Sequence, residues 1–148
     1  MNMEMYEARN SIYCYENSNV LKNKLGIKDN KNLAIYEAKI TAAKLLILRE
    51  TGISGNFDKM HFVGIHRFLF EDIYPFAGLF RTENIAKDSF MFANWQYIEE
   101  QLDALLNQLK NENYLANLDK TELAKRLAYY MSELNVLHPF RERKWENN

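Results

Sequence analysis

The sequence has few of the residues that cross-link a chain or interrupt helices. Its 148 residues include one cysteine, two prolines and five glycines. The single cysteine, Cys14, excludes an intramolecular disulfide, which fits a reducing compartment. So few prolines and glycines leave room for long uninterrupted helices.

An excess of one charge and a long apolar run are also missing. The 19 basic residues nearly balance the 20 acidic ones, so no general attraction to nucleic acid or membranes is expected. No stretch approaches the roughly 20 apolar residues of a membrane span, and residues 1–10 lack an apolar signal core. Hydrophobic residues make up 47% of the chain, enough for a folded core. These features predict a soluble, cytoplasmic protein with no nucleic-acid or membrane partner.

Apolar residues recur every three or four positions over most of the chain, as in amphipathic helices. A polar segment, residues 1–31, comes first and is expected to wrap around the domain. The first predicted helix carries the apolar line Leu33, Tyr36, Ile40, Ala43 and Ile47. The second carries Phe62, Ile65, Leu69 and Ile73, and Pro75 is expected to stop it. His66 on this helix is expected to be packed or hydrogen-bonded.

The helical period is lost between residues 77 and 92, where aromatic residues suit short strands and predict a hairpin-like loop. Asn94 is expected to N-cap the next helix. Asp119 and Glu122 form a capping-box pattern for the last long helix. The predicted buried line of that helix is Leu123, Leu127, Tyr130, Leu134 and Leu137. The sequence therefore predicts one all-α domain over residues 1–148, with a single short β-hairpin.

His138 and Glu142 are the candidate chemical groups. His138 follows the most regular helix, and its unperturbed pKa of about 6.5 suits a general base. Glu142 lies four residues later and offers oxygen ligands for Mg²⁺. Each residue alone is more often structural or simply solvated, so the surrounding residues have to decide.

Those surroundings resemble a known family. Residues 134–142, Leu-Asn-Val-Leu-His-Pro-Phe-Arg-Glu, are similar to the core of the Fic motif, His-Pro-Phe-x-Asp/Glu-Gly-Asn-Gly-Arg. Upstream, residues 65–78 and the pair Arg81-Thr82 resemble the Fic run that ends in Tyr-Pro-Trp-Ala-Gly and Arg-Thr. Residues 20–27 also look like the usual lead-in. The resemblance covers nearly the whole chain and implies a Fic-like helical domain whose hairpin is a flap.

The resemblance implies a protein adenylyltransferase of the short Fic type. Such enzymes move AMP from ATP to a Ser, Thr or Tyr hydroxyl of a target protein and release pyrophosphate. In that scheme His138 deprotonates the hydroxyl, Pro139 and Phe140 anchor the motif loop, and Glu142 binds the Mg²⁺ that bridges the phosphates. The flap would pair with the target backbone by strand addition. It comprises Lys87, Asp88, Ser89, Phe90, Met91, Phe92, Ala93 and Asn94.

The phosphate-binding half of the motif departs from the family. Arg143, Lys144, Trp145 and Glu146 stand where Fic proteins have Gly-Asn-Gly-Arg. Glycines let backbone N–H groups close around phosphate oxygens, and the arginine fork binds the same oxygens. The bulky side chains and the negative charge of Glu146 oppose both. The chain is therefore expected to be a C-terminally truncated Fic protein with weak or absent activity.

A single-base frameshift just after Glu142 would explain this ending. If the codon for Arg143 ends in GG, the following codons read one base later encode Gly, Asn or Ser, Gly, and Arg or Lys. Gly-Asn-Gly-Arg is among these readings, so we hypothesise an intact ancestral Fic gene. The loss of the helices that normally follow would also expose the apolar stripe of the last helix and predicts self-association.

Two other functions stay open at this point. Fic relatives also transfer other phosphate-containing groups, and the residues of the motif do not decide between them. The fold could also serve as a non-enzymatic module that binds peptides along the flap edge. Nucleotide binding separates the two enzymatic functions from this third one.

Overall fold

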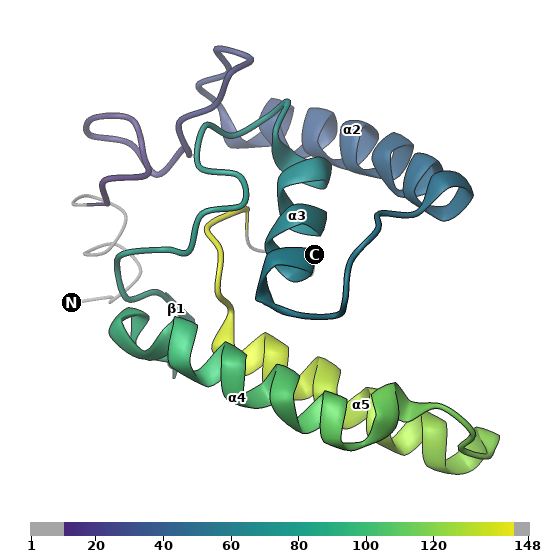
Figure 1. The fold of residues 1–148 in the computed structure, drawn as a ribbon. Helices are drawn as coiled ribbons and strands as arrows, with labels where there is room; N and C mark the ends of the chain where they lie inside the picture. The colour runs from purple at the N-terminus through teal and green to yellow at the C-terminus, as the bar shows by residue number, and fades with distance from the viewer. Residues whose placement is uncertain (1–10, 144–148) are drawn as a thin grey trace.

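Helices dominate the computed structural model, which describes residues 11–143 (Figure 1). The α-helices are α2 (Asn30–Thr51), α3 (Lys59–Phe70), α4 (Ile98–Asn111) and α5 (Lys120–Leu137). Two 3₁₀ turns, η1 (Trp95–Tyr97) and η2 (Asn113–Leu115), lie on either side of α4. Strands β1 (Ala86–Lys87) and β2 (Phe90–Met91) pair antiparallel, with Ala86 opposite Met91 and Lys87 opposite Phe90. The prediction of a helical fold with one short hairpin is confirmed.

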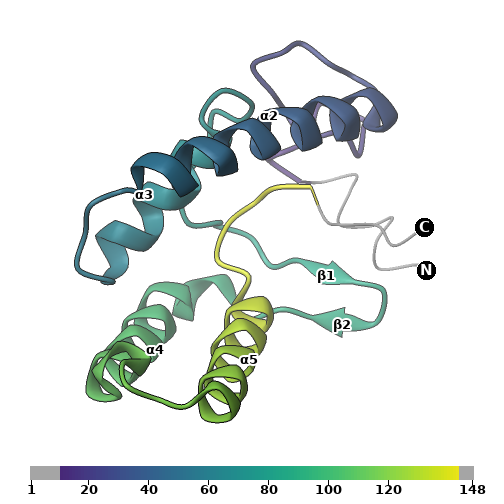
Figure 2. The ribbon, with the colours of Figure 1, turned by 90° about the vertical axis from the view of Figure 1, so that its right-hand side faces the viewer.

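The helices form two pairs joined by the end of the described chain. Helix α2 packs on α3, α4 packs on α5, and α3 also contacts α4. After α5 the chain runs back towards the α2–α3 pair, and the hairpin extends beside this returning segment (Figure 2). The residues of the candidate motif therefore lie between the two helix pairs. Within residues 11–143, none of the helices combines the length and apolarity needed to cross a membrane.

Local capping sets where the helices begin. The Asp119 carboxylate accepts a hydrogen bond from the Glu122 N–H at 2.9 Å, as the sequence predicted for α5. Asp58 caps α3 in the same way. The Asn94 side chain accepts from the Gln96 N–H and therefore caps η1, one short turn before α4 begins. Each cap provides an acceptor for an N–H that has no partner within its helix.

The apolar line predicted for α2 was out of phase. Leu33 is buried as expected, but Tyr36, Ala43 and Ile47 are exposed. The buried neighbour of Leu33 is the acidic residue Glu37, which accepts a hydrogen bond from the Tyr74 hydroxyl. A buried polar group is tolerated when it is hydrogen-bonded, so one distant tyrosine shifts the inward face of the helix.

Two further details differ from the sequence prediction. Helix α3 ends at Phe70, because the N–H groups of Ile73 and Tyr74 both turn back to the Phe70 carbonyl, at 3.0 and 2.9 Å. On α5, Tyr130 and Leu137 are buried, but Leu127 of the predicted line is half exposed.

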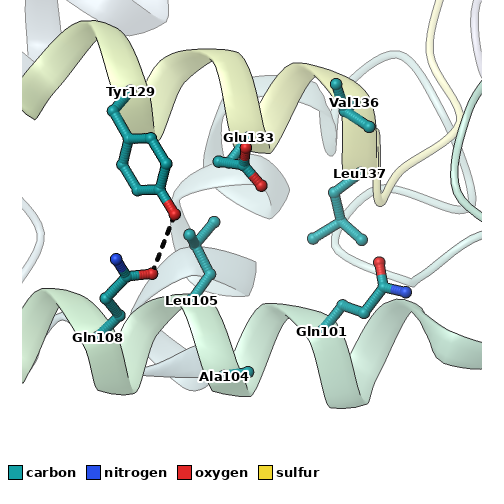
Figure 3. A pocket seen from close by; sticks show the side chains of 8 residues that line it. All are labelled: Gln101, Ala104, Leu105, Gln108, Tyr129, Glu133, Val136 and Leu137. Atoms are coloured by element: carbon teal, nitrogen blue, oxygen red, sulfur yellow. Dashed lines mark hydrogen bonds between the residues drawn. The ribbon is translucent and has the colours of Figure 1, made fainter.

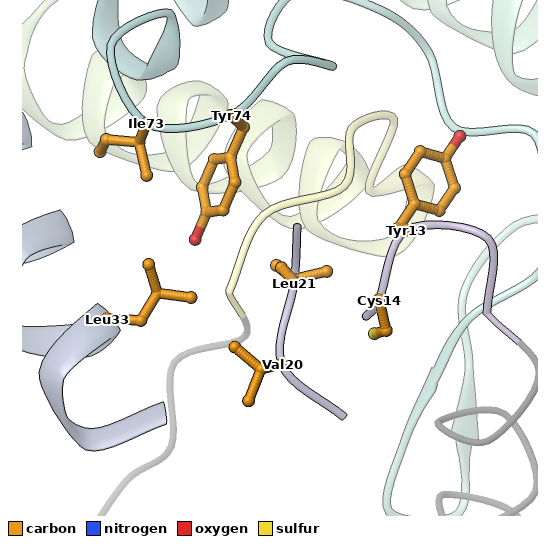
Figure 4. Close-up of a cluster of buried hydrophobic side chains, with 7 residues drawn as sticks. All are labelled: Tyr13, Cys14, Val20, Leu21, Leu33, Ile73 and Tyr74. Carbon is orange, nitrogen blue, oxygen red and sulfur yellow. The ribbon is translucent and has the colours of Figure 1, made fainter. Parts of the chain in front are cut away.

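The N-terminal residues contribute to the core beside α2. A cluster of buried side chains joins residues from three segments (Figure 4). It consists of Tyr13, Cys14, Val20, Leu21, Leu33, Ile73 and Tyr74. Burial raises the pKa of the Cys14 thiol, which makes this cysteine a poor nucleophile.

Candidate active site

His138 is the C-cap residue of α5 and has a left-handed backbone, with φ 44° and ψ 68°. Its N–H still donates to the Leu134 carbonyl at 2.8 Å. The imidazole ring stacks on the ring of Phe92 at a centroid distance of 4.6 Å. A left-handed conformation at a residue other than glycine costs on the order of 1–3 kcal/mol and persists only where the surroundings impose it.

Arg81 contacts the backbone that adopts this conformation. Its side chain is almost fully buried, with only 1% of the residue exposed. The guanidinium donates from Nε to the His138 carbonyl at 2.7 Å and from Nη2 to the Leu137 carbonyl at 3.0 Å. It also donates to the carbonyls of Ala93 and Glu83. A cation that binds the last carbonyls of a helix complements both their missing partners and the helix dipole.

Backbone hydrogen bonds hold the same segment from two sides. The Arg81 N–H donates to the Pro139 carbonyl at 3.0 Å, and Phe80 and Phe140 form an isolated antiparallel bridge. On the other side, the Ala93 N–H donates to the Val136 carbonyl at 3.1 Å. The chain around His138 is therefore fixed between the segment before the flap and the segment after it.

Phe140 and Pro139 are both buried. The Phe140 ring stacks against Phe62, His66 and Phe80, with centroid distances of 5.6, 3.8 and 5.5 Å. These rings come from α3 and from the segment before the hairpin. The motif loop is thus tied to α3 by aromatic packing directly after His138.

Glu142 lies between two histidines. Its Oε2 atom is 3.0 Å from His66 Nε2, and its Oε1 atom is 3.6 Å from His138 Nε2. The Glu142 side chain retains 21% of its accessible surface, so it is partly open to solvent. Within residues 11–143, no group of three or more His, Cys, Asp or Glu side chains is arranged to hold a metal ion. Any cation here would take most of its ligands from elsewhere.

Arg143, the first residue of the divergent segment, is held towards α2. Its backbone N–H donates to the buried Glu37 carboxylate, which also accepts from the Tyr74 hydroxyl. Burial raises the pKa of Glu37 above its ordinary value, and the hydrogen bond from Tyr74 partly offsets this. Burial and the nearby carboxylate also raise the pKa of Tyr74. Lys144, Trp145 and Glu146 lie outside the described residues.

The predicted flap residues occupy the hairpin and its exit. Asp88, with φ 56°, and Ser89 form the two-residue turn between Lys87 and Phe90. Phe90 and Met91 are about half exposed, whereas Phe92 is buried against His138. The Phe90 ring contacts the Phe92 ring edge-on at 5.3 Å. Ala93 is joined to α5, and Asn94 caps η1.

A separate hollow of about 270 Å³ lies between α4 and α5 (Figure 3). Gln101, Gln108, Tyr129 and Glu133 are among its lining residues, and the Tyr129 hydroxyl donates to Gln108 across it at 3.2 Å. None of the candidate site residues lines this hollow.

Sequence reasoning did not identify Arg81 and His66 as parts of this site. The sequence marked Arg81 only as a member of the upstream motif. The residues next to it in the sequence do not indicate that its side chain binds four carbonyls. His66 was expected to be packed or hydrogen-bonded, and it is, but its partner Glu142 stands 76 positions away. Only the upstream motif that contains both residues pointed to them.

Comparison with known proteins places this geometry in a family. Residues 56–142, more than half of the chain, match the Fic/DOC family. Protein adenylyltransferase VbhT of Bartonella schoenbuchensis is 41% identical over 140 residues, which make up 95% of this chain and 29% of VbhT. The chain therefore spans less than a third of that relative.

Two solved structures have a similar fold. One is the N-terminal Fic domain of a VirB-translocated effector from Bartonella quintana, with bound ADP. It has a TM-score of 0.82 at 29% identity, over 88% of this chain and 68% of that one. The other is BepC from Bartonella tribocorum with bound AMPPNP, with a TM-score of 0.82 at 27% identity, over 88% of this chain and 69% of that one.

Proposed function

This chain belongs to the Fic/DOC family, and on that premise we propose that its site is built to transfer AMP from ATP to a hydroxyl group of a target protein. The observation that carries the proposal is the joint position of His138, Glu142 and Phe92. The His138 ring lies 4.6 Å from the flap residue Phe92, and its Nε2 lies 3.6 Å from the Glu142 carboxylate. A base, a cation ligand and a peptide-binding edge therefore meet at one point.

In the proposed reaction His138 is the general base. Its Nε2 takes the proton of a Ser, Thr or Tyr hydroxyl as the oxygen attacks the α-phosphorus of ATP. The new bond joins that oxygen to the α-phosphorus, and the bond to pyrophosphate breaks. The stacked ring of Phe92 and the hydrogen bonds from Arg81 keep the imidazole in one orientation. A base held in the correct orientation lowers the reaction barrier further than its basicity alone would.

Glu142 is the proposed ligand of Mg²⁺. One or two carboxylates together with substrate phosphates are a common coordination set for this ion. The side chain fits that requirement, because His66 contacts one of its oxygens and the side chain as a whole is still partly exposed. When bound, Mg²⁺ would neutralise charge on the phosphates.

The flap would hold the target. An extended segment paired with the hairpin edge places alternate side chains on the same face, and Phe90 and Phe92 share the face that leads to His138. Phe90 and Met91 also offer half-exposed apolar surface to a peptide. This surface favours peptide binding without transfer as the second candidate function.

The residues at 143–146 are expected to keep the transfer slow. The Arg143 N–H is engaged by Glu37 rather than free to face a phosphate. Arg143 and Trp145 replace the two glycines that would let backbone N–H groups approach phosphate oxygens, and Glu146 replaces the arginine that would bind them. We therefore propose weak or absent activity for the chain as it stands, with the base and cation ligand retained.

A motif-restored variant tests the proposal. It carries Arg143→Gly, Lys144→Asn, Trp145→Gly and Glu146→Arg, and a second variant adds His138→Ala. Incorporation of label from α-³²P-ATP into protein of a cell extract should rise in the restored variant and return to background with His138→Ala. A panel of other labelled nucleotides identifies transfer of a different group.

The same chains are also tested by thermal unfolding with ATP and Mg²⁺, because a ligand above its dissociation constant raises the melting temperature. Binding with no transfer in the restored variant would overturn the assignment of His138 as the base. Absence of both would overturn the nucleotide site. Peptide binding by the unchanged chain in that case would support the second candidate.

A further inference from the structure

We propose that His66 is a positioning residue for Glu142, and that Gly78 sets the tautomer in which His66 does this. Neither residue contacts the transferred group. Both act through the Glu142 carboxylate. What Glu142 itself does rests on the proposed function above, but the chain of hydrogen bonds does not.

The first link is the backbone of Gly78. Its N–H lies 2.9 Å from His66 Nδ1, and a backbone N–H can only donate. Nδ1 is therefore the acceptor, and the single proton of the neutral imidazole lies on Nε2. Position 78 favours glycine, because its φ is +75° and an added Cβ would lie 2.8 Å from the Arg67 Cβ.

The second link is the contact between His66 and Glu142. With its proton on Nε2, His66 donates to Glu142 Oε2 at 3.0 Å. The other carboxylate oxygen is then the one that faces His138 Nε2. His66 thereby fixes the orientation of the carboxylate, with one oxygen bound to His66 and the other turned towards the base.

The ring of His66 has little freedom to move. The residue is 8% exposed, and its ring stacks on Phe140 at 3.8 Å and contacts Phe70 at 4.6 Å. Glu142 has several rotatable bonds of its own, so a rigid donor removes freedom that would otherwise be lost on binding a ligand. The donor is supplied by α3, which begins far upstream of the motif loop.

This arrangement is the kind that tunes metal ligands. A partner that holds a ligating side chain typically changes metal affinity or activity about 10–100-fold when it is removed. The inference also gives the upstream stretch, residues 65–78, a specific role. Its single histidine and its single glycine together orient the carboxylate of the downstream motif.

The matched variants separate orientation from packing. His66→Phe keeps a ring against Phe140 and removes both nitrogens, whereas His66→Gln keeps an N–H donor towards Glu142. His61→Phe is the control, because His61 lies on the same helix and its ring nitrogens are also hydrogen-bonded, to the Phe57 N–H and the Ile53 carbonyl. Those partners are remote from Glu142 in the chain and belong to the loop before α3.

The first measurement needs no metal. Imidazole ¹⁵N NMR of the full chain at neutral pH should show His66 unprotonated at Nδ1 and protonated at Nε2. Glu142→Ala should shift the His66 Nε2 signal and leave the His61 signals unchanged. A cationic or Nδ1-protonated His66, or no shift in Glu142→Ala, would overturn the proposal whatever the chain catalyses.

The second measurement uses Mn²⁺ with ADP as the probe and follows paramagnetic broadening of the His138 imidazole signals. The concentration needed for half-maximal broadening should rise about tenfold or more in His66→Phe, less in His66→Gln, and not at all in His61→Phe. Equal values for His66→Phe and the unchanged chain would contradict a positioning role. If the unchanged chain shows no broadening, the same series is measured in the motif-restored chain. If that chain shows no broadening either, the nucleotide function fails, and the ¹⁵N result alone decides the role of His66.

Discussion

Replacing Arg81 is the sharpest test of how the candidate base is held in place. Arg81 is 1% exposed and donates to the carbonyls of four residues: Glu83, Ala93, Leu137 and His138. Arg81→Met keeps a long apolar stem and removes every side-chain donor, while the backbone N–H that donates to the Pro139 carbonyl stays. The variant therefore leaves the carboxyl end of α5 and the exit of the flap without their shared partner.

The expected loss follows from these contacts. Leaving one buried acceptor unsatisfied costs about 1–3 kcal/mol. Water will reach some of the four carbonyls, so we expect a total of roughly 3–5 kcal/mol for Arg81→Met. That is a large part of the about 5–15 kcal/mol that stabilises a typical domain. It corresponds to a fall in melting temperature of roughly 10–15 °C. Arg81→Lys should be intermediate, because an ammonium group cannot reproduce the planar fork.

Urea unfolding followed by circular dichroism measures this loss from the midpoint at constant slope. Arg49→Met is the matched control: Arg49 is an exposed residue in the last turn of α2, and its replacement should change stability by no more than about 0.5 kcal/mol. If Arg81→Met and Arg49→Met unfold at the same urea concentration, the carbonyls do not depend on Arg81. The account of how His138 is held would then be wrong.

Three further predictions concern other parts of the chain. Because burial raises the pKa of Glu37, the stability that its protonated form contributes is present at low pH and is lost as pH rises from about 4.5 through the raised pKa. The Gln side chain of Glu37→Gln does not titrate. The urea midpoint of this variant minus that of the unchanged chain should therefore increase between pH 4 and pH 8, and equal pH dependence of the two midpoints would contradict this. Gly78→Ala should destabilise the fold by at least about 1–2 kcal/mol in thermal or urea unfolding, because alanine is strained at positive φ. Gly64→Ala, in open space within α3, should instead stabilise it by roughly 0.5–1 kcal/mol. Sequencing codons 140–148 of the source gene should show bases that encode Gly-Asn-Gly-Arg one base out of frame, and bases that cannot encode both glycines would rule out the frameshift.

Features set by neighbouring residues could be predicted from the sequence. The Asp119 cap depends on a backbone N–H three residues away, and it formed as expected. The hairpin, too, appeared where the helical period was lost. The inward face of α2 could not be predicted, because the burial of Glu37 depends on Tyr74, 37 positions further along the chain. The exposure of Leu127 could not be predicted for the same reason, because it depends on which helix α5 packs against.

The residues of the candidate site also fall into two groups, those that the sequence indicated and those that it did not. His138 and Glu142 stand four residues apart and were found by spacing and by resemblance to a motif. Their roles as base and cation ligand stay proposals. Arg81 and His66 act on them through contacts between distant segments, and a sequence alone does not show which carbonyl or carboxylate a buried side chain will reach.

Among the described residues, the contacts that hold the base and the carboxylate come from segments upstream of the motif. Arg81 and Phe92 contact the end of α5 and His138, and His66 contacts Phe140 and Glu142. All three come from upstream of the motif, so we expect a change at residues 143–146 to affect phosphate binding and to leave these supports in place. A chain altered there should therefore keep its base and its carboxylate in place. For this reason we expect restoring Gly-Asn-Gly-Arg to raise AMP transfer without any compensating change near His138.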